Sequence, residues 1–151
     1  MPCESARDLF RHALATLAYR GGNSFRGLPD TFSDFRLAPG SRSAGEILAH
    51  IGDLLDWALI TVKEKNVWRE SSPQEWHRGV ERFFTAVTAL DDYLASDAPL
   101  QAPLDKLLQG PIADALTHVG QIAMMRRIAA APMKFENYVQ ANIIVGRISP
   151  E

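Results

Sequence analysis

The chain has 151 residues, a formal net charge of −2, and 46% hydrophobic and 23% charged residues. This length and composition fit one globular domain with its own hydrophobic core, and the near-neutral charge gives no reason to expect nucleic acid or a membrane as partner. The one cysteine, Cys3, excludes an internal disulfide framework and suits a reducing compartment. With no signal peptide and no run of ~18 apolar residues, we expect a cytoplasmic protein. We expect a single domain over residues 1–151, with a core at about 5–131 and a tail at 132–151.

The first predicted helix runs from about residue 6 to residue 19. Ser5 resembles an N-cap, with Asp8 three residues on, and apolar residues then recur at helical spacing. The Gly21-Gly22 pair is expected to end this helix and to open a long connection, at about 21–42. Three aromatic residues predict that this connection packs onto the helices, as a lid over their mouth: Phe25, Phe32 and Phe35.

Three further helical segments follow in the sequence. The second is predicted at about 43–65, where Ser43 and Glu46 form a capping box, and the third at about 72–95, with Ser72 as its cap. The fourth is expected to be broken at Gly110-Pro111 and to end near residue 130, leaving an irregular tail laid over the bundle. Four amphipathic segments without a hairpin predict an all-α four-helix bundle.

Two of these helices carry polar residues at helical spacing beside the apolar face. The stripe on the second helix is spaced at i, i+4, i+7 and i+11 and consists of Glu46, His50, Asp53 and Trp57. At about 100° per residue these positions share one side of the helix, so His50 is expected to be at least half buried. The stripe on the fourth helix has the same spacing and consists of Asp114, His118, Gln121 and Met125.

These stripes predict a metal site made by His50, Asp114 and His118. Asp114 and His118 lie one turn apart, and packed helices face each other at about 8–10 Å, so His50 can join them on one ion. Three protein ligands with an open position are typical of a catalytic site, and nitrogen and oxygen donors suit zinc or nickel first, with iron or manganese as alternatives. Gln121 is expected to orient a ligand or to hydrogen-bond Asp114. Glu46 or Asp53 is a candidate base.

A metal-free interpretation stays open beside this one. Asp114 would then only hold His118 by a hydrogen bond or ion pair, and the protein would be a small-ligand-binding or stress-response protein. His12 and His77 fit the metal site less well, because His12 lies at the edge of an apolar stripe and His77 is expected to face solvent. The chain has no glycine-rich phosphate loop and no nucleophile elbow.

Two short stretches resemble the DinB/YfiT-like superfamily of bacterial four-helix bundles. They are residues 49–51 (Ala-His-Ile), with Trp57 following, and residues 117–122 (Thr-His-Val-Gly-Gln-Ile). Many members hold a metal with three histidines, one from the second helix and two from a His-x-x-x-His-Arg-Gly-Gln motif on the fourth. The resemblance covers the order of helices over about residues 5 to 130.

Matched residue by residue, the resemblance gives His50 and His118 the place of two ligands. Asp114 stands where the superfamily usually has its first fourth-helix histidine, and Val119 stands where arginine is usual. The resemblance implies a metal-dependent hydrolase or a thiol-dependent transferase, with a small-molecule substrate or a thiol as partner, and a homodimer formed through helix faces. Superfamily members link helices two and three by a crossover, which the six or seven residues between the predicted helices here do not favour.

Overall fold

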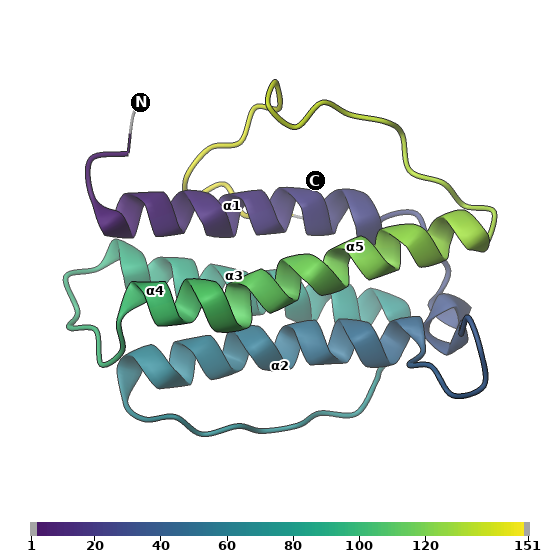
Figure 1. The fold of residues 1–151 in the computed structure, drawn as a ribbon, viewed down its shortest axis with the longest axis horizontal. Coiled ribbons are helices and arrows are strands. Elements are labelled where there is room, and N and C mark those ends of the chain that lie inside the picture. Colours follow the sequence, from purple (N-terminus) through teal and green to yellow (C-terminus); the bar gives the residue numbers. More distant parts are fainter. Residues whose placement is uncertain (1–2, 150–151) are drawn as a thin grey trace.

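The structure, a computed structural model, describes residues 3–149 and is helical wherever it is regular. Its elements in chain order are α1 (Ala6–Phe25), the 3-10 helix η1 (Asp30–Asp34), α2 (Ala44–Lys63), α3 (Trp76–Ala95), α4 (Leu104–Leu107), the π-helix η2 (Leu108–Ile112) and α5 (Ala113–Ile128). The first three long helices and the continuous rod α4–η2–α5 lie side by side (Figure 1). The prediction of an all-α four-helix bundle is confirmed. Among residues 3–149, no helix combines the length and apolar character needed to cross a membrane.

A long extended segment, residues 64–75, joins α2 to α3 and runs along the length of the bundle (Figure 1). The two helices are therefore parallel neighbours, as their contacts confirm: Gly79 faces Leu48, and about one turn further along both helices Arg82 faces Gly52. Twelve extended residues reach up to about 40 Å, enough to return along a 20-residue helix of about 30 Å. The expectation that no crossover is present was wrong, because α3 begins at Trp76 rather than near residue 72.

Helix α1 continues through Gly21-Gly22 to Phe25, so the prediction that this pair ends the helix was wrong. A Cβ atom on Gly21 would lie 2.6 Å from Cζ of Phe83, a side chain of α3 that is fully buried. The glycine therefore serves a close approach between α1 and α3. Its helical cost relative to alanine, about 1 kcal/mol, is offset by the packing that this approach allows.

The connection after α1 packs onto one end of the bundle, as its aromatic residues predicted. Phe25 and Phe32 are buried, and both rings meet the indole of Trp76 edge to face, with the Phe32 centroid 4.9 Å away. Nε1 of Trp76 donates a hydrogen bond to the carbonyl of Phe25 at 2.8 Å. The connection is thereby fixed against the start of α3, and Phe35 stacks on Phe32 from outside.

The fourth rod is not interrupted at Gly110-Pro111, contrary to the prediction. The chain passes from α4 to α5 through the π-helical turn η2, which contains Pro111. Proline has no N–H to donate, and a wider turn accommodates that loss without ending the helix. Beyond residue 131 the described chain forms no helix or strand and lies along α1 (Figure 1), where Glu136 accepts hydrogen bonds from Tyr19 and Asn23. The predicted irregular tail over the bundle is confirmed as far as residue 149.

Candidate metal centre

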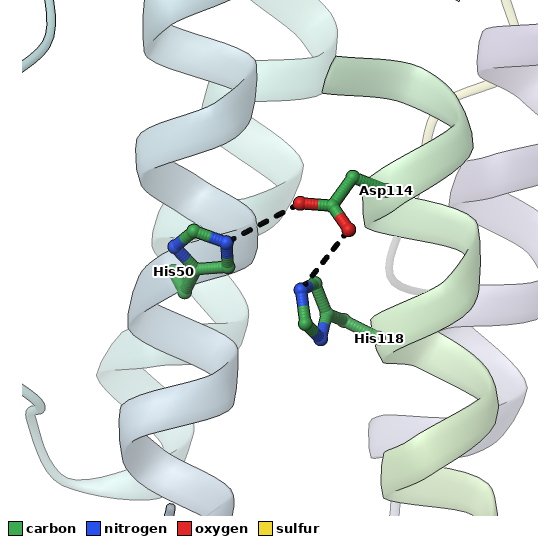
Figure 2. Close-up of side chains that lie close together, drawn as sticks. All are labelled: His50, Asp114 and His118. Atoms are coloured by element: carbon green, nitrogen blue, oxygen red, sulfur yellow. Dashed lines mark hydrogen bonds and ion pairs between the residues drawn. The ribbon is translucent and has the colours of Figure 1, made fainter. Parts of the chain in front are cut away.

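The three predicted ligands meet between α2 and α5 (Figure 2). Nε2 of His50 lies 3.4 Å from Oδ2 of Asp114, and Nε2 of His118 lies 3.3 Å from Oδ1 of the same carboxylate. One donor atom from each residue lies within 4.8 Å of the other two, and the imidazole centroids are 4.8 Å apart. Two of these residues share one helix and the third comes from its neighbour, so the helix packing itself brings the group together.

Local sequence signals fix the position of each ligand along its helix. The capping box of α2 is complete: Glu46 N–H donates to the Ser43 hydroxyl, and the Ser43 N–H donates to the Glu46 carboxylate. His50 follows one turn after Glu46. On the other side, Asp114 stands in the first turn of α5, directly after the π-helical turn. Such wide turns are frequent next to functional sites, because they shift the face that the following side chains present.

The site is closed on one side and open on the other. The side chains of His50 and His118 are 19% and 12% exposed, whereas that of Asp114 is 45% exposed. The two imidazoles therefore lie inside the interface of α2 and α5, and the carboxylate lies at its rim. An ion held by all three would be reached from the Asp114 side, where a water or a substrate could complete its coordination.

The environment of His50 favours a neutral imidazole, which is the form that binds metals. Burial, the neighbouring His118 and the positive charge of Arg42 together lower the pKa of His50 from its usual 6.5, against the opposing effect of Asp114. Because the pKa is lowered, His50 stays uncharged at neutral pH and its nitrogen lone pair is free to ligate.

A hydrogen bond to Gln121 orients the ring of His118 toward the Asp114 carboxylate. Nδ1 of His118 donates to Oε1 of Gln121 at 2.7 Å, so in the neutral ring Nε2 carries no hydrogen and points at Asp114. A lone pair facing a carboxylate oxygen is repulsive unless a proton or a cation lies between them. The predicted role of Gln121 in orienting a ligand is thus compatible with its contact, which is made to His118 and not to Asp114.

The separations between the donors are close to those around a bound ion. The two nitrogen-to-oxygen separations at Asp114 are 3.3 and 3.4 Å, and each imidazole faces a different oxygen of the carboxylate. Both are longer than the 2.7–3.2 Å that is usual for a hydrogen bond. One donor atom from each residue lies within 4.8 Å of the other two, so the three side chains could hold one divalent ion after a small adjustment.

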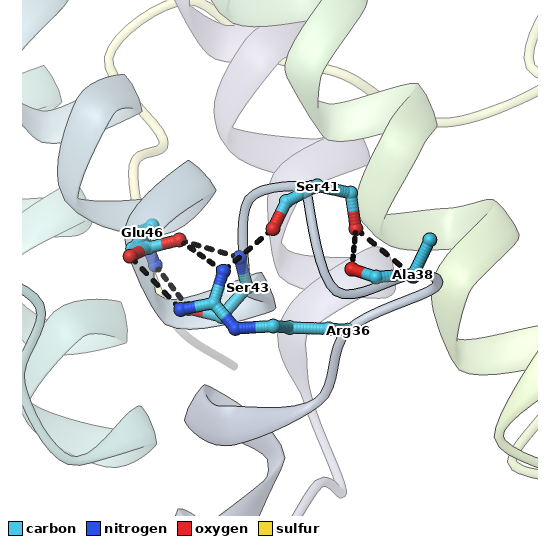
Figure 3. A network of polar contacts seen from close by, with 5 residues as sticks. All are labelled: Arg36, Ala38, Ser41, Ser43 and Glu46. Atoms are coloured by element: carbon cyan, nitrogen blue, oxygen red, sulfur yellow. Dashed lines mark hydrogen bonds and ion pairs between the residues drawn. The ribbon is translucent and has the colours of Figure 1, made fainter.

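The structure does not bring Glu46 or Asp53 to this group. The Glu46 carboxylate accepts two hydrogen bonds from Arg36, at 2.9 and 3.1 Å, and one from the Ser43 N–H, at 2.7 Å (Figure 3). These contacts lower the pKa of Glu46. Asp53 is buried and accepts hydrogen bonds from Ser71 and Arg82. At ~100° per residue, Asp53 and His50 point ~60° apart, which is enough to direct one at α3 and the other at α5.

Trp68 belongs to the surroundings of the site, a position that its sequence context did not indicate. Its ring lies 5.7 Å from that of His50 and 5.8 Å from that of Trp57, and the residue is 42% exposed. Trp68 sits in the extended crossover, so no helical spacing relates it to the site. Only the path of residues 64–75 along α2 brings it there.

A second group of possible ligands lies at the surface, at the start of α3. Asp30 accepts hydrogen bonds from both the backbone N–H and Nδ1 of His77, at 2.9 and 2.8 Å, and Glu75 lies nearby. All three residues are exposed, in agreement with the expectation that His77 faces solvent. These contacts are those of a helix cap, because Asp30 accepts a hydrogen bond from the N–H of His77 in the first turn of α3.

Comparison with known proteins adds no further assignment: no family model, curated protein or solved structure matches the chain.

Proposed function

We propose that the protein binds one divalent metal ion through His50, Asp114 and His118, with zinc or nickel as the first candidates. The observation that carries this proposal is the convergence of two imidazoles, from neighbouring helices, on one carboxylate, with one donor atom from each residue within 4.8 Å of the other two. In this proposal the protein is a DinB-like metalloprotein in which aspartate replaces one of three histidine ligands.

The open side at Asp114 supports a catalytic role for this ion. A bound divalent ion lowers the pKa of a water or thiol ligand and so supplies a nucleophile near neutral pH, as a metal-dependent hydrolase or a thiol-dependent transferase requires. The chain contributes the other parts. Gln121 holds the ring of His118 in place, and the carboxylate of Asp114, which lies at the rim of the site, is the group that could accept the proton released at the open position. In this role Asp114 replaces the candidate bases Glu46 and Asp53, which are engaged elsewhere.

Calorimetric titration of the metal-free protein with zinc tests this proposal directly. We expect one equivalent of zinc to bind, and His118→Ala to weaken binding by more than the ~10–100-fold loss that is typical of a residue outside the ligand set. His77→Ala is the matched control, because it removes a histidine from the exposed group at the start of α3 and should leave the zinc affinity unchanged.

Two results would reject the metal site. The first is no zinc binding by the wild-type protein, which would favour the metal-free alternative with an Asp114–His118 ion pair. The second is equal zinc affinity in wild type and His118→Ala. If His77→Ala lost zinc and His118→Ala retained it, the zinc would be bound by the exposed group of Asp30, Glu75 and His77.

A further inference from the structure

An apolar groove of about 330 Å³ opens beside the candidate metal centre. Its walls come from the segment before α2, from α2 and from α5, and its apolar surface includes Leu37, Ile47 and Met124. His118 and Gln121 also line it, so the groove reaches the site at one of the three candidate ligands. A volume of this size lies at the lower end of the range for small-molecule sites.

One unpaired cation lines this otherwise mostly apolar groove. Arg42 is exposed and, among residues 3–149, makes no ion pair with a carboxylate. Its neighbour in the same segment behaves differently: Arg36 is held by Glu46 and by the carbonyl of Ser41 (Figure 3). The contacts of Arg36 fix the segment in place and leave the charge of Arg42 available to a ligand.

We propose that the groove binds a small organic carboxylate, with its carboxylate at Arg42 and its apolar part against Leu37, Ile47 and Met124. The proposal rests on the proposed metal function, since His118 lines the groove and would bring a bound ligand next to the ion. It names the class of substrate for that site: a small molecule with one negative charge and an aliphatic or aromatic body.

The composition of the groove selects this class of ligand over others. A single arginine balances a single negative charge, whereas a phosphate dianion usually meets several cations or a row of backbone N–H groups. The unbranched side chains of Met124 and Met125 can adapt to apolar bodies of different shape. Leu37 and Met124 are 51% and 54% exposed, and a bound apolar body would remove part of this surface from water.

Calorimetry with butanoate, hexanoate and octanoate tests the proposal on the full chain, with and without zinc. We expect affinity to rise about 2–4-fold for each added methylene, because each one buries apolar surface in the groove. Arg42→Gln should weaken all three acids about tenfold and keep the dependence on chain length, as expected for a lost charge-assisted hydrogen bond. Met124→Gln should instead weaken the dependence of affinity on chain length. Arg78→Gln is the matched control, since Arg78 is an exposed arginine on α3.

The outcomes separate this proposal from that of the metal site. Acids that bind zinc-free protein with the same dependence on Arg42 would support the groove even if zinc does not bind. Zinc binding without any dependence of acid affinity on chain length would overturn the groove and leave the metal site standing. The groove proposal would also be overturned by equal affinities in wild type and Arg42→Gln.

Discussion

Helix α2 carries two polar clusters only three residues apart, and the two are built in opposite ways. Asp53 faces α3, where its oxygens accept hydrogen bonds from Ser71 and from Arg82, at 2.7–3.0 Å. His50 faces α5, where its Nε2 lies 3.4 Å from an oxygen of Asp114. The first cluster pairs a cation with carboxylates at short distance. The second brings two imidazoles to one carboxylate at the longer separations of 3.3 and 3.4 Å.

This difference distinguishes a structural link from a ligand site. In the Asp53 cluster the cation is supplied by the chain, and the hydrogen bonds join α2, α3 and the crossover into one unit. In the His50 cluster the chain supplies a group of donor atoms that could hold a cation. Burial alone does not separate the two, because both lie at helix interfaces. The two clusters differ in whether the chain itself supplies the cation and the hydrogen-bond donors that balance the carboxylates.

The largest expected effect comes from breaking the cluster that is complete. Arg82→Met leaves Asp53, 3% exposed, without its cation, and the loss of one partner of a buried ion pair costs about 3–5 kcal/mol. Urea unfolding of the metal-free protein measures this loss. Arg78→Met is the control, because its ion pair with Glu75 is exposed and should contribute at most about 1 kcal/mol. Equal losses in both variants would show that the Asp53 cluster does not hold the helices together.

A smaller effect is expected from Gln121, the residue that orients His118. Gln121→Ala frees the His118 ring to adopt the other tautomer and should lower zinc affinity about 10–100-fold, with little change in unfolding free energy. Competition with a zinc chelator measures the affinity. Thr117→Ala is a suitable control, since its hydroxyl only bonds the carbonyl one turn back on the same helix. Unchanged affinity in Gln121→Ala would remove the role assigned to this hydrogen bond.

The smallest effect is expected from pH acting on the metal-free protein. The folded pKa of His50 lies below its usual 6.5, mainly through burial, so the unfolded chain binds a proton more readily than the folded one. His50 therefore makes the folded state less stable as the pH drops below 6.5, and it causes no change of stability with pH above that value. His77 has the opposite sign, because hydrogen bonding to Asp30 raises its pKa. Unfolding of wild type and His50→Gln, both in the His77→Gln background, isolates the first effect; parallel curves between pH 5 and 8 would contradict it.

The all-helical fold and the pairing of Asp114 with His118 follow from periodicity within single helices, and both were predictable. His50 joins this pair through the packing of α2 against α5 in the expected bundle. Spacing at i and i+4 places Asp114 and His118 together whatever the rest of the chain does. The features that were missed depend on contacts between helices. Gly21 reads as a helix stop in isolation, and only the ring of Phe83 against it shows why the helix continues.

The surroundings of the site were less predictable for the same reason. Trp68 and Arg42 come from connections, where no period relates a residue to a distant helix. Ser72 and Pro73 form a plausible start for a helix, yet α3 begins at Trp76, because the indole N–H binds the end of α1 and Ser71 is held by Asp53. Tertiary hydrogen bonds outweighed a local signal worth about 1 kcal/mol.

The central claim is that His50, Asp114 and His118 are completed by a metal ion, and a crystal structure of the zinc-loaded protein tests it most directly. With data collected at the zinc absorption edge, we expect one anomalous peak between α2 and α5, about 2.0–2.2 Å from Nε2 of both histidines and from an oxygen of Asp114. No peak there in crystals grown with zinc, or a peak only at Asp30, Glu75 and His77, would contradict the claim.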